Sequence, residues 1–420
     1  YIADLKVENS MKYKNFDEAD LINDELISAI EPLYKKNQKF YTLRYSIALS
    51  RKAEIYEEID ELTAIEYYDK AIKIRNEAIE KYHVDFERLN AWDILNTARL
   101  LKKSIDDQDS FNMCISSFRD ALNIFVKYNH INGFDFTMNI YKTYREIGDL
   151  FNDYSMYEDA ITEYLMALDA VMNEEETYGK EIMYINSKLG NCQMKTGAYE
   201  DAKSSFTAAL NYLVPTYEKN SSLFPEVIGD TVENLMDLAI IFESKEEARV
   251  QMINADFFYE RLLEKDFTYY ERALARVHYH YGHFIRNDDA KEALTHLSKS
   301  LVYYQKAFKA NPIDFISDYQ IILDDLVYIS DTRLNQHEKA VEFLFNAIKV
   351  FESTNERADE VEVVYQKYLL GIVLLLLEAN LDSYALDYFK KVKYTLLNDE
   401  LKCVYFANHI IIMIHLNQIN

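Results

Sequence analysis

A spaced pattern of small and large apolar residues recurs along the chain. Ala202 is followed by Phe206 four residues later and by Ala209 seven residues later. Positions i, i+4 and i+7 lie on one face of an α-helix, so the pattern predicts an amphipathic helix that packs through that face. Gly190 lies a dozen residues upstream, across a short polar turn. Two antiparallel helices that cross closely need small side chains at the crossing, and a large one fills the gap beside it.

The same pattern returns at a nearly constant interval. The small residue of the second helix in each unit is called the anchor here. The nine anchors are Ala19, Ala64, Cys114, Ala160, Ala202, Ala248, Ala293, Ala340 and Ala385. Four residues after most anchors stands a large apolar residue, as in Tyr68, Phe118 and Tyr164. Such periodicity indicates a repeat protein, in which each helical pair buries its apolar face against its neighbours.

The spacing Leu189-Gly190, Tyr199, Ala202 and Phe206 resembles the tetratricopeptide repeat, and the interval of about 46 residues is a long variant of its usual unit of about 34. The resemblance implies an all-α fold, a right-handed superhelical solenoid of antiparallel helix pairs. We expect about nine repeats in a single domain over residues 1–420, with an unpaired C-terminal helix over residues 399–417.

Composition and net charge argue against several fold classes and several kinds of binding partner. Eight glycines and four prolines in 420 residues are too few for the many turns of a β-sandwich, a propeller or a doubly wound fold. A net charge of −25 argues against direct nucleic-acid binding and against an anionic membrane surface. The longest apolar run, residues 369–377, is too short to span a bilayer and predicts a buried helix.

Few residues of the chain suggest a catalytic or metal-binding site. Cys114, Cys192 and Cys403 are far apart and odd in number, which predicts buried thiols in a reducing cytoplasm rather than disulfides or a zinc site. A metal-binding helical enzyme would depend on His278, His280, His283 and His296, which we interpret as ordinary helix-face histidines. Adjacent acids such as Asp324-Asp325 are expected to point in different directions on a solvated helix surface. We therefore predict no catalytic residues, no metal and no cofactor.

The resemblance also implies a binding groove lined by the first helix of each unit. One subclass of the family holds a peptide's terminal carboxylate with a Lys, Asn, Asn, Lys, Arg set over three repeats. Asn191 and Asn234 match the two asparagine places, and Arg276 matches the second lysine place. Ser187 stands at the first lysine place and His280 at the arginine place, so these two positions differ from the family set. Asparagine amides bind a peptide backbone, and arginine binds a carboxylate bidentately. The predicted groove residues, with a local focus of positive charge, are Asn191, Lys195, Asn234, Arg276, Tyr279, His280, His283 and Arg286.

These features predict a cytoplasmic, non-enzymatic scaffold or sensor that holds a protein or peptide partner. Bacterial peptide-sensing tetratricopeptide regulators resemble the chain in their long repeats and asparagine-lined grooves. The alternative is the sensing or scaffold region of a larger effector, whose catalytic domain, such as a caspase-like protease, lies outside this chain. Tyr at position 1 and the unpaired last helix support that alternative. The pattern specifies no oligomeric state.

Overall fold

The computed structural model describes residues 2–220, 225–263, 267–354 and 358–418. Within these ranges the regular structure is entirely helical, with nineteen α-helices, two short 3-10 turns and one π-helix. The chain divides into two compact units, Tyr1–Ala209 and Leu210–Asn420, and the boundary falls inside α10 (Tyr199–Lys219). The two units are described separately.

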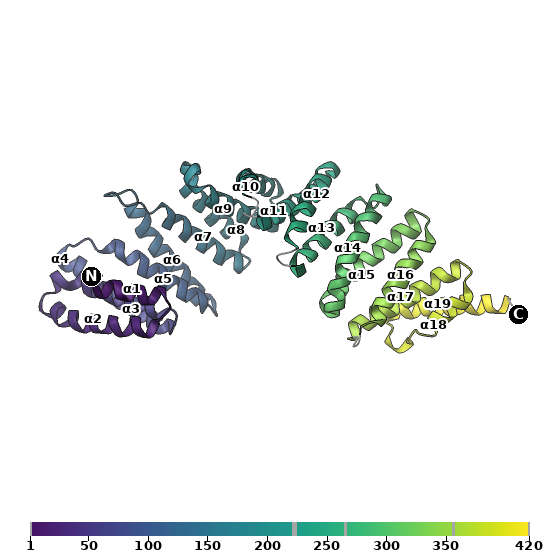
Figure 1. Ribbon diagram of the computed structural model, residues 1–420, viewed down its shortest axis with the longest axis horizontal. Coiled ribbons are helices and arrows are strands. Elements are labelled where there is room, and N and C mark those ends of the chain that lie inside the picture. The colour runs from purple at the N-terminus through teal and green to yellow at the C-terminus, as the bar shows by residue number, and fades with distance from the viewer. Residues whose placement is uncertain (1, 221–224, 264–266, 355–357, 419–420) are drawn as a thin grey trace. The chain divides into compact units, whose positions relative to one another are not determined.

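Unit 1 stacks helical hairpins, in which a first helix is followed by an antiparallel second helix (Figure 1). The paired helices include α3 with α4, α5 with α6 and α7 with α8. Its helices are α1 (Ile2–Lys12), α2 (Phe16–Lys36), α3 (Gln38–Tyr56), α4 (Glu61–Tyr82), α5 (Glu87–Lys103), α6 (Gln108–Tyr128), α7 (Thr137–Asp153), α8 (Tyr157–Val171), α9 (Glu175–Thr196) and the first half of α10.

Unit 2 repeats this arrangement, with α11 paired to α12 and α13 paired to α14. Its helices after α10 are α11 (Pro225–Ile241), α12 (Lys245–Leu262), α13 (Phe267–Ile285), α14 (Ala290–Ala310), α15 (Pro312–Tyr328), α16 (His337–Glu352), α17 (Asp359–Glu378), α18 (Asp382–Phe389) and α19 (Asp399–Gln418). A π-helix, η2 (Ile329–Arg333), extends the end of α15. The predicted all-α fold of antiparallel helix pairs is confirmed. One continuous solenoid over the whole chain stays a prediction.

The anchors occupy equivalent places in these pairs. All nine lie on second helices, from α2 to α18, and each is fully buried. A Cβ atom on Gly148 of α7 would lie 2.6 Å from the ring of Tyr164, and one on Gly190 of α9 would lie 2.6 Å from the ring of Phe206. Small residues therefore stand where the paired helices cross, as the sequence predicted, and the large residue covers the crossing. These contacts make the pairs tetratricopeptide-like.

The tight turns between paired helices are built without many glycines. The residue directly before the N-cap position has a positive φ in several units, as in Ser155 (58°), Glu243 (55°), Asn335 (53°) and Asn380 (58°). Gly197 has the same conformation before α10. The glycine shortage excluded the β-rich folds correctly, but it did not mean that left-handed turns are scarce, because other residues adopt that conformation here at some cost.

Other expectations have mixed outcomes. Residues 369–377 form the buried core of α17, apart from Gly371, which is partly exposed, and Leu374, which is 37% exposed. Burial raises the pKa of the Cys114 and Cys192 thiols to about 11, so both are inert core residues. The expectation for Cys403 was wrong, because this residue is exposed on α19. Among the described residues, every helix is too short or too polar to cross a lipid bilayer.

Candidate protein-binding face

Six of the eight predicted groove residues lie on two neighbouring first helices of unit 2 or directly after one of them. Asn234 is on α11, and α13 carries Arg276, Tyr279, His280 and His283. Arg286 is in the turn that follows α13. The remaining two, Asn191 and Lys195, are exposed on α9 of unit 1. We call the six residues of unit 2, with the carboxylates that bind them, the first-helix face.

Arg276 is already held by a carboxylate. Its Nε donates to Oε1 of Glu233 at 2.9 Å and its Nη2 donates to Oε2 at 3.0 Å, a bidentate pair between α13 and α11. The hydroxyl of Tyr259 donates to the same Oε2 at 2.6 Å. Burial acts to lower the pKa of Arg276, but the bonds to Glu233 outweigh it and raise that pKa above its usual value. Arg276 stays charged and fixed, with 40% of its side chain exposed.

The two histidines of the face are held in the same way, on opposite sides of α13. Nδ1 of His280 lies 2.9 Å from Oδ1 of Asp237 on α11, and Nδ1 of His283 lies 2.5 Å from Oδ2 of Asp325 on α15. Burial acts to lower the pKa of His280, but the hydrogen bond to Asp237 raises it overall. The ring of Tyr279 packs against both histidines, with ring centroids 5.7 and 5.4 Å away.

This pairing changes the predicted electrostatics. The expected focus of positive charge is wrong for unit 2, because Glu233, Asp237 and Asp325 compensate it from the adjacent helices. Arg286 lies 3.9 Å from Asp325 as well. Asp325 is also not on a solvated surface, since only 15% of its side chain is exposed. It does point away from its neighbour Asp324, as expected, because Asp324 binds Lys367 of α17 at 2.7 Å.

The pairs form a ladder that sequence reasoning missed. Acidic and basic side chains alternate from one first helix to the next, acidic on α11, basic on α13, acidic on α15 and basic on α17. The members are separated by 42 or 43 residues, one repeat. In unit 1, Asp149 of α7 binds Lys188 of α9 at 2.9 Å in the same manner. Comparing positions 42 or 43 residues apart, rather than at the anchors' interval of about 46, would have shown the complementary charges.

The other two candidate histidines lie inside the helix pair. His278 is fully buried, as a packing residue of the repeat should be, and its Nδ1 lies 3.0 Å from Nδ1 of His296 on α14. Its Nε2 lies 3.1 Å from Oδ1 of Asp256 on α12. Over the described part of the chain, histidine, cysteine and acidic side chains form no group of three that could hold a metal ion.

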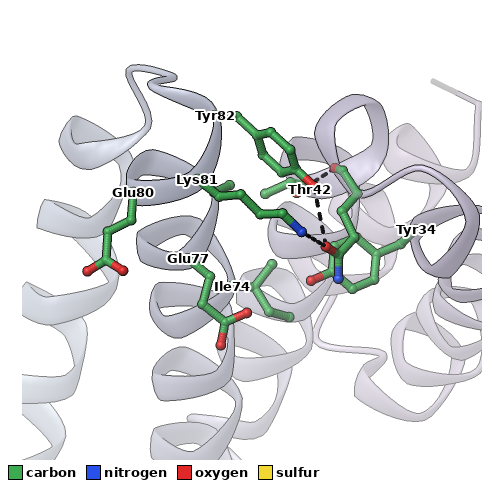
Figure 2. A pocket seen from close by; sticks show the side chains of 9 residues that line it. Tyr34, Thr42, Ile74, Glu77, Glu80, Lys81 and Tyr82 are labelled. Carbon is green, nitrogen blue, oxygen red and sulfur yellow. Dashed lines mark hydrogen bonds between the residues drawn. The ribbon is translucent and has the colours of Figure 1, made fainter.

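A separate hollow of about 540 Å³ lies in unit 1 (Figure 2). It lies between the end of α2, the start of α3 and the end of α4, and Gln38 is one of its lining residues. Nζ of Lys81 donates to Oε1 of Gln38 at 3.2 Å, and the hydroxyl of Tyr82 donates to the same atom at 3.4 Å. The glutamates Glu77 and Glu80 also line it. The hollow is polar and contains none of the predicted groove residues.

Several solved structures are distantly similar to this chain. Aspartyl phosphate phosphatase F from Bacillus subtilis is 14% identical, with 76% of this chain and 73% of that chain covered and a TM-score of 0.39. The C-terminal part of a TPR repeat-containing protein from Cytophaga hutchinsonii is 17% identical, with 72% and 94% covered and a TM-score of 0.43. The assembly chaperone of RpL4, residues 1–338, is 15% identical, with 63% and 89% covered and a TM-score of 0.36.

No family model and no curated protein sequence matches the chain. The tetratricopeptide-like assignment therefore depends on the helix pairs and on the contacts between small and aromatic residues described above.

Proposed function

We propose that the chain is a non-enzymatic scaffold that binds an extended segment of a partner protein across the first-helix face of unit 2. The observation that carries this proposal is the set of half-exposed side chains fixed by bonds between repeats. Arg276, His280 and His283 keep 40, 36 and 40% of their side chains exposed while each is bound to a carboxylate of a neighbouring first helix. Side chains that are already ordered lose little entropy when a ligand binds.

The pairing of Arg276 with Glu233 also bears on whether the ligand is a chain end or an internal segment. A peptide's terminal carboxylate would have to replace Glu233 at Arg276, at the cost of leaving a buried acid without its partner. A segment that uses its backbone amides and carbonyls avoids that exchange. The ring of Tyr279 offers such a segment an amphipathic contact surface, and the side chain of Asn234 is an amide, the group that binds a peptide backbone. We therefore favour recognition of an internal segment over recognition of a chain end.

A test starts from 12-residue peptides selected by phage display on the full chain. Affinities are then measured by fluorescence anisotropy for the unmodified protein, for Asn234→Ala and for Tyr279→Ala. We expect each variant to weaken binding about tenfold with an unchanged melting temperature, because both residues contact the ligand and neither is in the core. Val302→Ala is the matched control, since Val302 is 55% exposed on the second helix α14.

The control should change the affinity less than twofold. Selected peptides that bind both face variants as tightly as the unmodified protein would contradict the proposal. Amidation of the peptide's C-terminus separates the two ligand classes, because it should leave the affinity of an internal segment unchanged. The cytoplasmic location and the larger-effector alternative stay predictions.

A further inference from the structure

A second cavity, which lies in unit 2, is lined by both apolar and charged side chains. It has a volume of about 400 Å³ and lies between the end of α15 with η2 on one side and the start of α19 on the other, over α17. Leu344 and Leu370, 3 and 1% exposed, make an apolar floor, and Leu401 and Val404 of α19 add an apolar wall. The volume is in the range of pockets that hold small ligands or single side chains.

A glycine in the floor has no packing reason to be there. Gly148, Gly190, Gly229 and Gly282 each lie within 3.0 Å, measured from an added Cβ, of a side chain from the facing helix. Gly371 differs, because an added Cβ would meet only Leu344 Cδ1, at an ordinary 3.5 Å. A glycine inside a helix costs about 1 kcal/mol relative to alanine. What its missing side chain provides at Gly371 is open space in the cavity, where a ligand can approach the α17 backbone.

More acidic than basic side chains line the cavity. Asp324, Asp331 and Glu400 line it, and Lys367 is the cation among its lining residues. Lys367 is bonded to Asp324 at 2.7 Å, so that pair is neutral as a whole. Asp331 and Glu400 remain at the rim, Asp331 in contact with His337 and Glu400 exposed in the first turn of α19. The π-helix η2 carries Asp331 into this position, and π-helices are often found at functional sites.

We propose that this cavity binds an alkyl chain that ends in an ammonium group, as in the lysine side chain of a bound protein segment. The alkyl stem packs over Gly371 and against Leu370 and Leu401, and the ammonium group is bound by Asp331 and Glu400. A lysine buries its methylene groups in this way while its charge stays at the surface. The lysine source depends on the proposed function, whereas the ammonium site itself does not.

The test uses methyl NMR spectra of the full chain with labelled leucine and valine. Hexylammonium chloride, sodium hexanoate and hexan-1-ol are titrated at equal ionic strength. We expect saturable shifts at the methyl groups of Leu370, Leu401 and Val404 with hexylammonium, at an affinity at least tenfold above that of the other two probes. Equal affinity for hexanoate or for hexan-1-ol would overturn the proposal.

Variants locate the binding. Asp331→Asn combined with Glu400→Gln should weaken hexylammonium at least tenfold, and Gly371→Leu should abolish the shifts by filling the floor. Asp399→Asn is the control, because Asp399 is a fully exposed acid of the same helical turn that does not line the cavity. Thermal melting checks that each variant is folded. An unchanged affinity in the folded double variant also contradicts the proposal.

A final comparison separates this proposal from the proposed function. Ac-Ala-Ala-Lys-Ala-Ala-amide is titrated beside versions with norleucine or glutamate at the centre, and the lysine peptide should bind at least tenfold more tightly. Hexylammonium binding without any peptide binding would keep the ammonium site and reject the lysine source. Binding of displayed peptides to the first-helix face without hexylammonium binding would keep the proposed function and reject the ammonium site.

Discussion

The ring of Phe206 lies directly on Gly190, so that a Cβ atom at position 190 would be 2.6 Å from Cε1 and 2.7 Å from Cδ1 of the ring. Phe206 is 1% exposed and Ala202, one turn earlier on the same helix, is fully buried. The ring has no solvent-facing direction in which to move. The close approach of α9 and α10 therefore depends on glycine at this place.

Gly190→Ala should lower the free energy of unfolding by about 1–3 kcal/mol, because the methyl group overpacks the crossing. Gly371→Ala should instead raise it by roughly 0.5–1 kcal/mol, because alanine favours a helix and its Cβ fits. Urea denaturation measures both. Adding Phe206→Leu to Gly190→Ala should recover part of the loss. Equal effects at the two glycines would mean that the packing at Gly190 is not tight.

The sequence predicted this part of the fold because close packing is a steric requirement that each repeat must satisfy separately. Even the two anchors that match the pattern least, Ala19 and Cys114, are fully buried on second helices. In several units the extra length is in the helices, as in α4 with 22 residues and α14 with 21, whereas α18 has only 8. A small residue at a helix crossing can be recognised within a single repeat. Its recurrence in the other repeats supports that interpretation.

The candidate site was less predictable, because its geometry depends on pairs of residues one repeat apart. Arg276 alone suggests a ligand's carboxylate, but Glu233, 43 residues earlier, already binds it. Asp325 looked like a solvated acid until His283 was placed beside it. Such pairs follow from how successive first helices align, and the variable repeat length hides that alignment in the sequence.

Glycine substitutions in a left-handed turn and in the helix that follows it should change the free energy of unfolding in opposite directions. Glu243 has a φ of 55°, and a left-handed conformation is costly for a residue with a Cβ atom. Glu243→Gly should raise the free energy of unfolding by about 0.5–1 kcal/mol. The control, Glu246→Gly in the first turn of α12, should lower it by about 1 kcal/mol, because there glycine weakens a helix. Urea denaturation of both variants measures the difference, and destabilisation by both would contradict the prediction.

A buried ion pair in unit 1 gives a prediction by double substitution. Arg75 and Asp93, with side chains 2 and 7% exposed, are bonded to each other, and Ser50 donates to Asp93 at 2.6 Å. Asp93→Leu should cost about 3–5 kcal/mol, because it leaves the Arg75 guanidinium buried without its partner. Arg75→Met combined with Asp93→Leu should recover most of that loss, since no buried charge remains. Chemical denaturation of both single variants and the double variant tests this, and additive losses would contradict the prediction, because they would mean that the two side chains do not stabilise each other.

The buried histidine pair predicts how stability depends on pH. Burial, and then the neighbouring His278, lower the pKa of His296 to about 4, against about 6.5 in the unfolded chain. The other charged or titratable groups that face the pair are Asp256 and Arg249 of α12, Tyr281 of α13, and Glu292 and Lys299 of α14. Between pH 6.5 and 4 the unfolded chain binds a proton at this position and the folded chain does not. His296 should therefore remove about 3 kcal/mol of stability as the pH falls through that window, with no further loss from this residue below pH 4.

His296→Gln tests this dependence, because glutamine offers His278 a neutral hydrogen-bonding partner that does not titrate. The difference between the unmodified protein and the variant isolates His296 from the carboxylates and from His280, whose raised pKa has the opposite effect: it contributes stability below pH 6.5 that is lost as the pH rises. Urea denaturation at half-unit steps from pH 7 to 4 gives the two curves. From pH 6.5 to 4 the stability of the unmodified protein relative to the variant should fall by about 3 kcal/mol, because only the unmodified protein has the titrating His296. Parallel curves would mean that the pKa of His296 is not lowered in the folded chain, which would contradict the prediction.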